Sequence, residues 1–185
     1  MTPFFGKRII SNIRKQFRNL RNPIEHIKMS ALFDTTRNLS LYSIPVAWVL
    51  SILPHSYAIT RSSSFDNRNP REYSDNLDAD KNIDETTKGR ILRAEAAQMN
   101  GLENIGLFAA AVVAGNVAGL SAKTLNLLSG GYLVSRAVYN FLYINSTTQM
   151  MGHARSAVYT VGIVNIMTLF ITSGNNLKDK AANLL

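Results

Sequence analysis

The chain has 185 residues, a net charge of +8 and no cysteine. The length suits one ordinary domain, and the lack of cysteine excludes a disulfide framework and a thiolate metal site. The three histidines are scattered without the spacing of metal ligands, so we expect no metal site. The body after residue 28 carries only +2 of the net charge, which argues against a nucleic-acid partner.

The positive charge is concentrated in residues 1–28, which carry a net charge of +6. Apolar side chains recur there at helical spacing: Phe4, Ile9, Ile10, Ile13, Phe17 and Leu20. This pattern is typical of a mitochondrial targeting segment or of an amphipathic helix on a membrane surface. The alternative is an extension that precedes a functional start at Met29. We treat residues 1–38 as a basic N-terminal arm.

The mean hydropathy of −0.01 averages two very different parts of the chain. Tyrosines aside, the ionisable side chains of residues 96–177 are Glu103, Lys123, Arg136, His153 and Arg155. So few charges leave too little polar surface for a water-soluble fold. We therefore expect lipid or partner chains to cover this region.

Four apolar segments predict four transmembrane helices, at residues 39–60, 96–119, 124–144 and 154–173. Each is close to the ~20 residues that a bilayer requires. Residues 61–92 are polar and read as a loop on the membrane surface, and residues 178–185 read as a tail. Short connections between the later helices predict antiparallel neighbours. The expected fold is an all-α, four-helix membrane bundle over residues 39–177.

Polar side chains within these helices fall on single faces. Arg93, Asn100 and Glu103 share one face of the second helix, whereas Arg136, Tyr139 and Tyr143 share one face of the third. The fourth helix carries Arg155 and Tyr159 one turn apart, with Ser156 beside Arg155. Because a charge in the bilayer is costly, we expect these faces to turn inward.

Two interpretations of the inward charges stay open. In the first, Glu103 pairs with Arg136 or Arg155 and simply holds the helices together. One carboxylate cannot neutralise two arginines, however. In the second, the remaining positive charge binds an anionic ligand that carries a carboxylate or a thiolate.

At these residues the sequence resembles the MAPEG family, the membrane-associated proteins of eicosanoid and glutathione metabolism. The resemblance covers roughly residues 39–173. It rests on "NGLEN" at 100–104 followed by "LF" at 107–108, on "SRAVYNFLY" at 135–143, and on "ARSAVYT" at 154–160. The last of these is similar to the fourth helix of the prostaglandin E synthase branch.

The resemblance implies a homotrimer that binds glutathione between neighbouring subunits. It implies glutathione contacts from Asn100, Glu103, Arg136, Tyr139 and Tyr143, with Gln98 at a position that is often polar. It further implies a catalytic group of Arg155, Ser156 and Tyr159, in which Arg155 stabilises the thiolate. Characterised members carry an arginine where this chain has Ala96, so either Arg93 substitutes for it or glutathione binds weakly or not at all.

Three functions are consistent with these patterns. The first is a glutathione-dependent transferase or peroxidase that acts on lipophilic electrophiles or lipid hydroperoxides. The second is a non-catalytic lipid-binding or accessory protein of the same fold, which the alanine at position 96 favours. The third is an unrelated small transporter or scaffold. The family suggests the endoplasmic reticulum, and the basic arm suggests a mitochondrial membrane.

Overall fold

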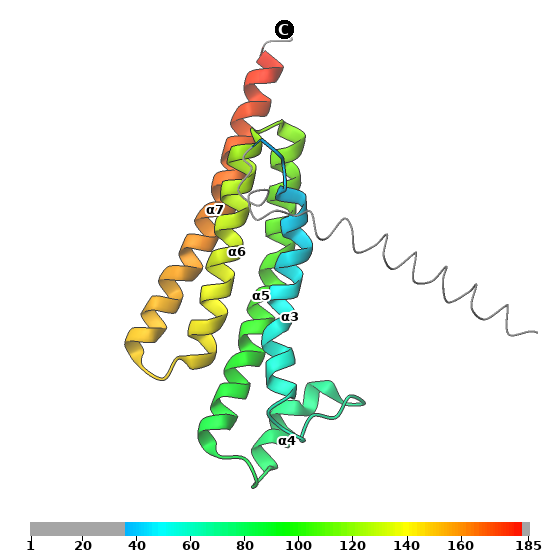
Figure 1. Ribbon diagram of the computed structural model, residues 1–185, viewed down its shortest axis with the longest axis vertical. Coiled ribbons are helices and arrows are strands. Elements are labelled where there is room, and N and C mark those ends of the chain that lie inside the picture. Colours follow the sequence, from blue (N-terminus) through cyan, green and yellow to red (C-terminus); the bar gives the residue numbers. More distant parts are fainter. Residues whose placement is uncertain (1–35, 183–185) are drawn as a thin grey trace, which may run out of the picture. The chain divides into compact units, whose positions relative to one another are not determined.

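The computed structural model describes residues 36–182, so the predicted segment 1–28 lies outside the described residues (Figure 1). In the described residues all secondary structure is helical, with five α-helices, two 3₁₀ helices and no strand. This confirms the predicted all-α class. The helices are η1 (Ser40–Tyr42), α3 (Ser43–Ile59), η2 (Pro70–Glu72), α4 (Tyr73–Ala79), α5 (Glu85–Ala118), α6 (Ala122–Asn145) and α7 (Gln149–Ala182).

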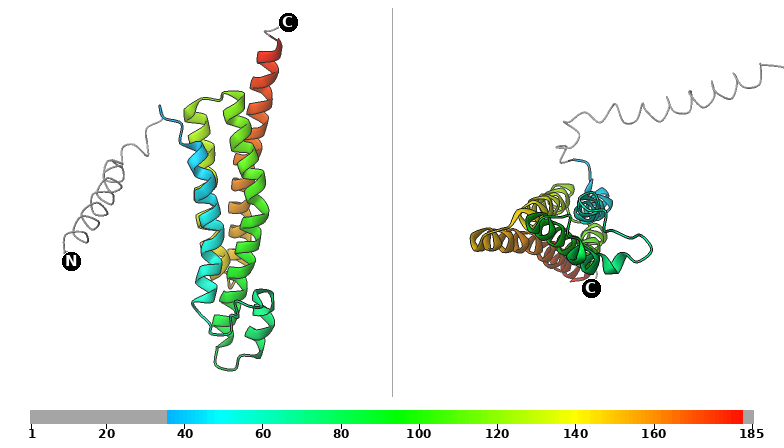
Figure 2. Two further views of the ribbon diagram at one scale, coloured as in Figure 1. Left: turned by 90° about the vertical axis from the view of Figure 1, so that its right-hand side faces the viewer. Right: turned by 90° about the horizontal axis from the view of Figure 1, so that it is seen from below.

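Four long helices lie lengthwise against one another (Figures 1 and 2). Helix α5 contacts α3, α6 and α7, while α6 contacts α3 and α7. The connections between α5 and α6 and between α6 and α7 are short, which makes consecutive helices antiparallel neighbours, as their sequence spacing predicted.

The polar segment 61–92 is more ordered than the sequence suggested. It contains η2 and α4, and its last eight residues form the first turns of α5. Asp84 caps that helix, because its Oδ1 accepts a hydrogen bond of 2.9 Å from the Thr87 backbone N–H. The hydrogen bond from the Thr87 hydroxyl has the largest effect in lowering the pKa of Asp84, and the hydrogen bond from the Thr87 backbone N–H lowers it further. Helix α7 likewise continues to Ala182, through the first residues of the expected tail.

Two helices, α5 and α7, are long and apolar enough by composition to cross a membrane. Helix α3 has 17 residues, somewhat fewer than the ~20 that span a bilayer. Helix α6 has 24 residues, but polar side chains such as Asn126, Arg136 and Asn140 interrupt its apolar sequence. The described part of the chain therefore supports two of the four predicted spans directly.

On helix α3, small side chains face inward and large apolar ones face outward. The buried stripe of α3 consists of Ser43, Ala47, Ser51, Pro54 and Ala58. The opposite surface of the same helix exposes Val46, Trp48, Val49 and Leu53. Without a hydrophobic drive between helices in lipid, small residues let the backbones approach closely. This inverted pattern suits a helix that is surrounded by lipid or by partner chains.

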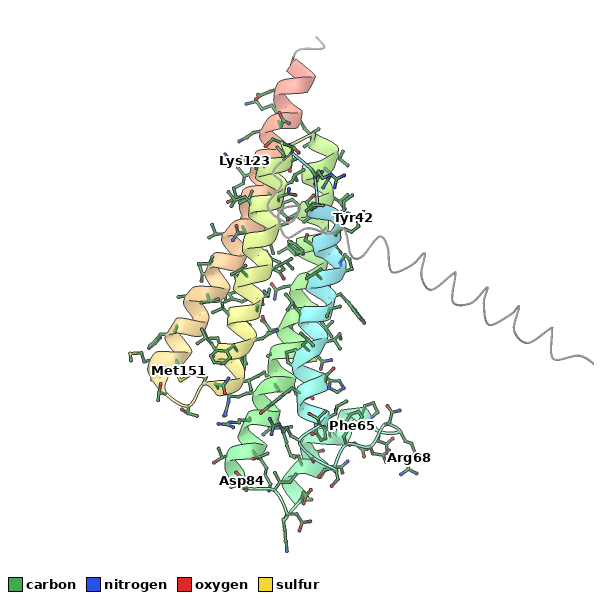
Figure 3. The ribbon with its side chains drawn as sticks, in the orientation of Figure 1. Tyr42, Phe65, Arg68, Asp84, Lys123 and Met151 are labelled. Carbon is green, nitrogen blue, oxygen red and sulfur yellow. The ribbon has the colours of Figure 1, made fainter. Side chains whose placement is uncertain are left out.

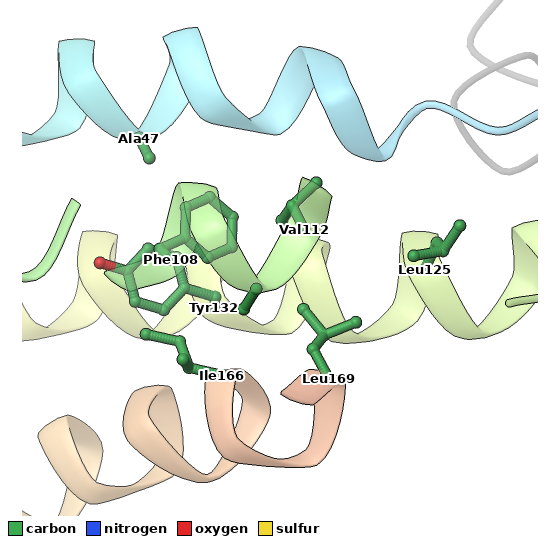
Figure 4. Packing of buried hydrophobic residues seen from close by; sticks show 8 residues of the cluster. Ala47, Phe108, Val112, Leu125, Tyr132, Ile166 and Leu169 are labelled. Atoms are coloured by element: carbon green, nitrogen blue, oxygen red, sulfur yellow. The ribbon is translucent and has the colours of Figure 1, made fainter. Parts of the chain in front are cut away.

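A central layer of larger side chains joins all four long helices (Figure 4). The rings of Phe108 from α5 and Tyr132 from α6 stack with their centroids 4.0 Å apart. Ala47 of α3 and Ile166 of α7 close this layer from the other two helices. The layer matters for the site, because Arg136 lies one turn beyond Tyr132 on the same face of α6.

Pro54 removes one backbone hydrogen bond from the interior of α3. A proline has no N–H, so the carbonyl four residues earlier, that of Leu50, loses its intrahelical donor. The side-chain amide of Asn140 on α6 donates a hydrogen bond of 2.8 Å to this carbonyl. The interruption in α3 therefore specifies how α3 and α6 are aligned.

Replacement of Gly101 by alanine should destabilise the protein. A Cβ at this position would lie 2.8 Å from the Cβ of Ser51 and 3.1 Å from its Cα, so α3 and α5 would have to separate. We expect a loss of about 1–3 kcal/mol, the usual cost of overpacking. Gly106→Ala is the matched control, because a Cβ there meets nothing within 4 Å. It should leave the thermal midpoint in detergent unchanged or raise it slightly.

Asn140→Leu should cost about 1–3 kcal/mol, because it leaves the partly buried Leu50 carbonyl without its donor. The cost should shrink when Pro54→Ala is also present, since the restored backbone N–H can reach that carbonyl. Thermal unfolding of the two single variants, the double variant and the parent protein measures this coupling. Equal costs of Asn140→Leu in both backgrounds would disprove the compensation.

Candidate functional site

The centre of the candidate site is Arg136, which is only 4% exposed. Its guanidinium lies over three tyrosine rings, with centroid distances of 5.3 Å to Tyr132, 5.0 Å to Tyr139 and 5.1 Å to Tyr159. Two of the rings come from α6 and the third from α7. We call Tyr132, Tyr139 and Tyr159 the tyrosine cage. Such rings attract a cation through their negative faces, more strongly when water is excluded.

The guanidinium is only partly satisfied by hydrogen bonds. Its Nη1 donates to the side-chain oxygen of Asn100 on α5 at 2.8 Å. Its Nε and Nη2 are buried, and no group in the described part of the chain accepts from them. A buried charge is costly unless it is paired and hydrogen-bonded. The site therefore has the donors, and the positive charge, to bind an anionic group.

Two asparagines of α5 build the opposite wall of this site. The side-chain N–H of Asn104 donates to the Asn100 backbone carbonyl at 2.7 Å, which fixes the amide one turn further along the helix. The Tyr159 hydroxyl then donates to the Asn104 side-chain oxygen over a longer distance of 3.4 Å. One polar face of α5 is thereby joined to both α6 and α7.

The second arginine, Arg155, lies beside the tyrosine cage near the start of α7. Its guanidinium is 4.1 Å from the centroid of the Tyr143 ring. Tyr143 packs edge-on against Tyr139 at 5.4 Å, and Tyr139 lies 5.9 Å from Tyr159. A continuous set of aromatic rings thus connects the two arginines.

The remaining predicted residues have other environments. Arg93 donates from Nε to the Ile144 carbonyl at 3.1 Å, where it caps the end of α6. Ser156 is exposed, and its hydroxyl donates to the Gly152 carbonyl of its own helix. Glu103 is also exposed, and within residues 36–182 it forms no ion pair with Arg136 or Arg155. Within the described part of a single chain, the predicted ion pair between Glu103 and Arg136 or Arg155 is therefore not formed.

Gln98 is separated from the tyrosine cage. It lines a different hollow, together with His55 and Glu95, on another side of α5. The structure thus brings Asn100, Arg136, Tyr139 and Tyr159 into direct contact. Tyr143 and Arg155 lie next to them.

Sequence reasoning missed two members of the site, Tyr132 and Asn104. Tyr132 precedes Arg136 by four residues and Asn104 follows Asn100 by four, so helical spacing alone could have found both. Tyr132 resembles an ordinary core residue because its ring stacks on Phe108. Among the described residues, no group of three or more histidine, cysteine, aspartate or glutamate side chains could hold a metal ion.

In the described part of the chain, the fold and the site together show an all-helical protein with two helices apolar enough to cross a membrane and a buried arginine. Residues 40–175 match the model of the MAPEG family. The match covers well over half of the chain, so the protein belongs to the MAPEG family, as the three sequence motifs predicted. Comparison with curated proteins and with solved structures gives no match. Family membership supports a membrane protein related to eicosanoid and glutathione metabolism.

Asn100→Leu should destabilise the protein by about 1–3 kcal/mol, because it removes the amide oxygen that accepts from Arg136 Nη1 and leaves this nitrogen unpaired beside the buried Nε and Nη2. Thermal unfolding in detergent measures the loss. Asn145→Leu is the matched control, since the Asn145 amide binds only the Phe141 carbonyl of its own helix. The control should change stability by no more than about 0.5 kcal/mol. Equal midpoints for both variants would contradict the assignment.

Proposed function

We propose that the protein is a multi-pass membrane enzyme that uses glutathione to modify lipophilic electrophiles or to reduce lipid hydroperoxides. In this proposal α3, α5, α6 and α7 all cross the membrane as a bundle, and three copies assemble into a homotrimer. The observation that carries the proposal is the buried guanidinium of Arg136, whose Nε and Nη2 have no acceptor in the described part of the chain.

The properties of these donors fit a carboxylate of glutathione. A guanidinium offers two parallel N–H groups to the two oxygens of a carboxylate, and such charge-assisted bonds are about twice as strong as neutral ones. The remaining guanidinium nitrogen, Nη1, already donates to the side-chain oxygen of Asn100. The hydroxyls of Tyr139 and Tyr143 add neutral donors and acceptors beside it. Asn100, Arg136, Tyr139 and Tyr143 would therefore hold the tripeptide.

Arg155 is the proposed group that activates the thiol. Glutathione supplies a thiol that attacks an electrophilic carbon or reduces a peroxide bond. A nearby fixed cation favours the ionised form of a thiol, which is the nucleophilic form. Arg155 is half-buried, and its guanidinium lies over the ring of Tyr143. This contact places its charge at the edge of the tyrosine cage. Ser156 and Tyr159 would assist from the same helix.

A trimer would account for the predicted residues that one chain leaves exposed. Glu103 lies on the outer surface of α5, where a neighbouring subunit could bring a glutathione amine to its carboxylate. Large apolar side chains such as Leu102 and Leu107 are exposed on the same helix. Subunit contacts and lipid would cover them, and lipophilic substrates dissolved in the membrane could enter between the helices.

The alternative is a non-catalytic, lipid-binding member of the family. One observation favours it: position 96 is an alanine, and Arg93, the proposed substitute, donates its Nε to the Ile144 carbonyl. The site would then lack one anchor for glutathione. The location is proposed as the endoplasmic reticulum, with a mitochondrial membrane as the alternative suggested by the arm.

Titration of the detergent-purified protein with glutathione, followed by thiolate absorbance, tests the proposal. We expect a saturable thiolate signal and glutathione-dependent turnover of a lipophilic electrophile. Arg155→Ala should reduce both at least about tenfold, the effect of one unit in the pKa of the bound thiol. Arg90→Ala, which removes an exposed arginine of α5, is the matched control.

Two results distinguish the alternatives. Binding without turnover, in a protein whose Arg155→Ala variant behaves like the parent, would favour the non-catalytic member. No thiolate signal at saturating glutathione, in protein with a normal thermal midpoint, would reject glutathione as the cofactor.

A further inference from the structure

A second hollow lies where the last turns of α3 meet α5 and the segment that leads into α4. Its volume is about 440 Å³, within the roughly 300–1,000 Å³ of typical small-molecule sites. It is lined by His55, Pro70, Tyr73, Leu92, Glu95, Gln98 and Met99. None of these residues contributes to the tyrosine cage.

The polar centre of this hollow is a histidine–glutamate pair. His55 Nδ1 lies 2.8 Å from Glu95 Oε1, and the side chains are 26% and 28% exposed. The imidazole is also held by Phe65, whose ring packs edge-on against it at 5.5 Å. Phe65 in turn packs edge-on against Tyr73, and the Tyr73 hydroxyl donates to the Ala58 carbonyl at 3.0 Å. The loop that carries Phe65 meets the lower end of α3 in Figure 3.

The charge of the pair selects the chemistry of a ligand. With a neutral imidazole the pair carries −1, and with a protonated imidazole it carries zero. In neither state is it positive, and none of the lining residues whose side chains the structure describes is a lysine or an arginine. An anionic head group is therefore disfavoured here, in contrast to the cage around Arg136. A hydroxyl group suits both states, because it can donate to the carboxylate or to a neutral imidazole and accept from a protonated one.

The apolar part of the hollow suits an acyl chain. Leu92 and Met99 line it and are also 40% and 59% exposed. Their outer surfaces continue along α5 into the exposed Leu102. The hollow thus lies where the polar loop meets the apolar surface of the helices, which is where the head group of a lipid is found.

We propose that this hollow binds the head group of an uncharged, hydroxyl-bearing single-chain lipid. The His55–Glu95 pair binds the hydroxyl groups, the Gln98 amide adds a further hydrogen-bonding group, and Leu92 and Met99 contact the start of the acyl chain. Glu95 and Asn100 are five residues apart, so they lie on nearly opposite sides of α5. The hollow therefore lies on a different side of α5 from Asn100 and the tyrosine cage, although Glu103 follows Met99 by one helical turn.

Native mass spectrometry of the full-length protein in detergent tests this inference. The probes are three lipids with the same oleoyl chain: monooleoylglycerol, oleic acid and lysophosphatidic acid. We expect monooleoylglycerol to bind at least tenfold more tightly than either anionic lipid. Glu95→Gln keeps the shape of the side chain and should weaken monooleoylglycerol binding about tenfold. Glu85→Gln, on the same helix and outside the hollow, is the matched control and should bind like the parent.

A second variant keeps the test decisive if Glu95→Gln fails to fold. Leu92→Trp should fill the hollow and abolish monooleoylglycerol binding, while the His55–Glu95 pair is retained. Equal binding of the neutral and anionic lipids, or unchanged binding in both hollow variants, would overturn the inference.

Discussion

Among the described residues, one buried guanidinium without a carboxylate partner joins three helices. Arg136 needs acceptors and aromatic faces, and neutral groups from three helices supply them: Asn100 from α5, Tyr132 and Tyr139 from α6, and Tyr159 from α7. An ion pair would have cancelled the charge and left nothing for a ligand. Neutral partners hold the arginine in place and preserve its charge, so the same contacts that fix the helices also keep the site attractive to an anion.

Helix α5 separates two environments of opposite electrostatic character. One side carries Asn100, which accepts a hydrogen bond from Arg136, and the other carries Glu95, which pairs with His55 in the second hollow. The proposed ligands, a charged peptide and an uncharged lipid, require such different surroundings. The two proposed sites would then lie on different sides of a single helix.

Much of this arrangement could be predicted from the sequence. Apolar length and sparse charge gave the long helices, and helical spacing placed Asn100, Arg136 and Tyr159 on inward faces. The first turns of α5 could not be predicted from hydropathy, because they lie in a polar segment where Asp84 caps the helix and Ile91 packs in a cluster with Leu77 of α4. The environment of Arg93 depends on where α6 ends in space, and the His55–Glu95 pair joins residues 40 positions apart. Neither contact has a signature in a single helix.

The 34 residues of α5 make a rod of about 51 Å, longer than the ~30 Å hydrocarbon thickness of a bilayer. In the proposed membrane bundle its first turns, beginning at Glu85, carry polar side chains and would project beyond the lipid tails. The same continuous rod carries Glu95 near the surface and Asn104 and Phe108 deeper inside. Because a helix bends little over a few turns, a tilt imposed at its outer end displaces all of them together. The orientation of α5 at its outer end therefore also sets where Asn100 meets Arg136 on α6.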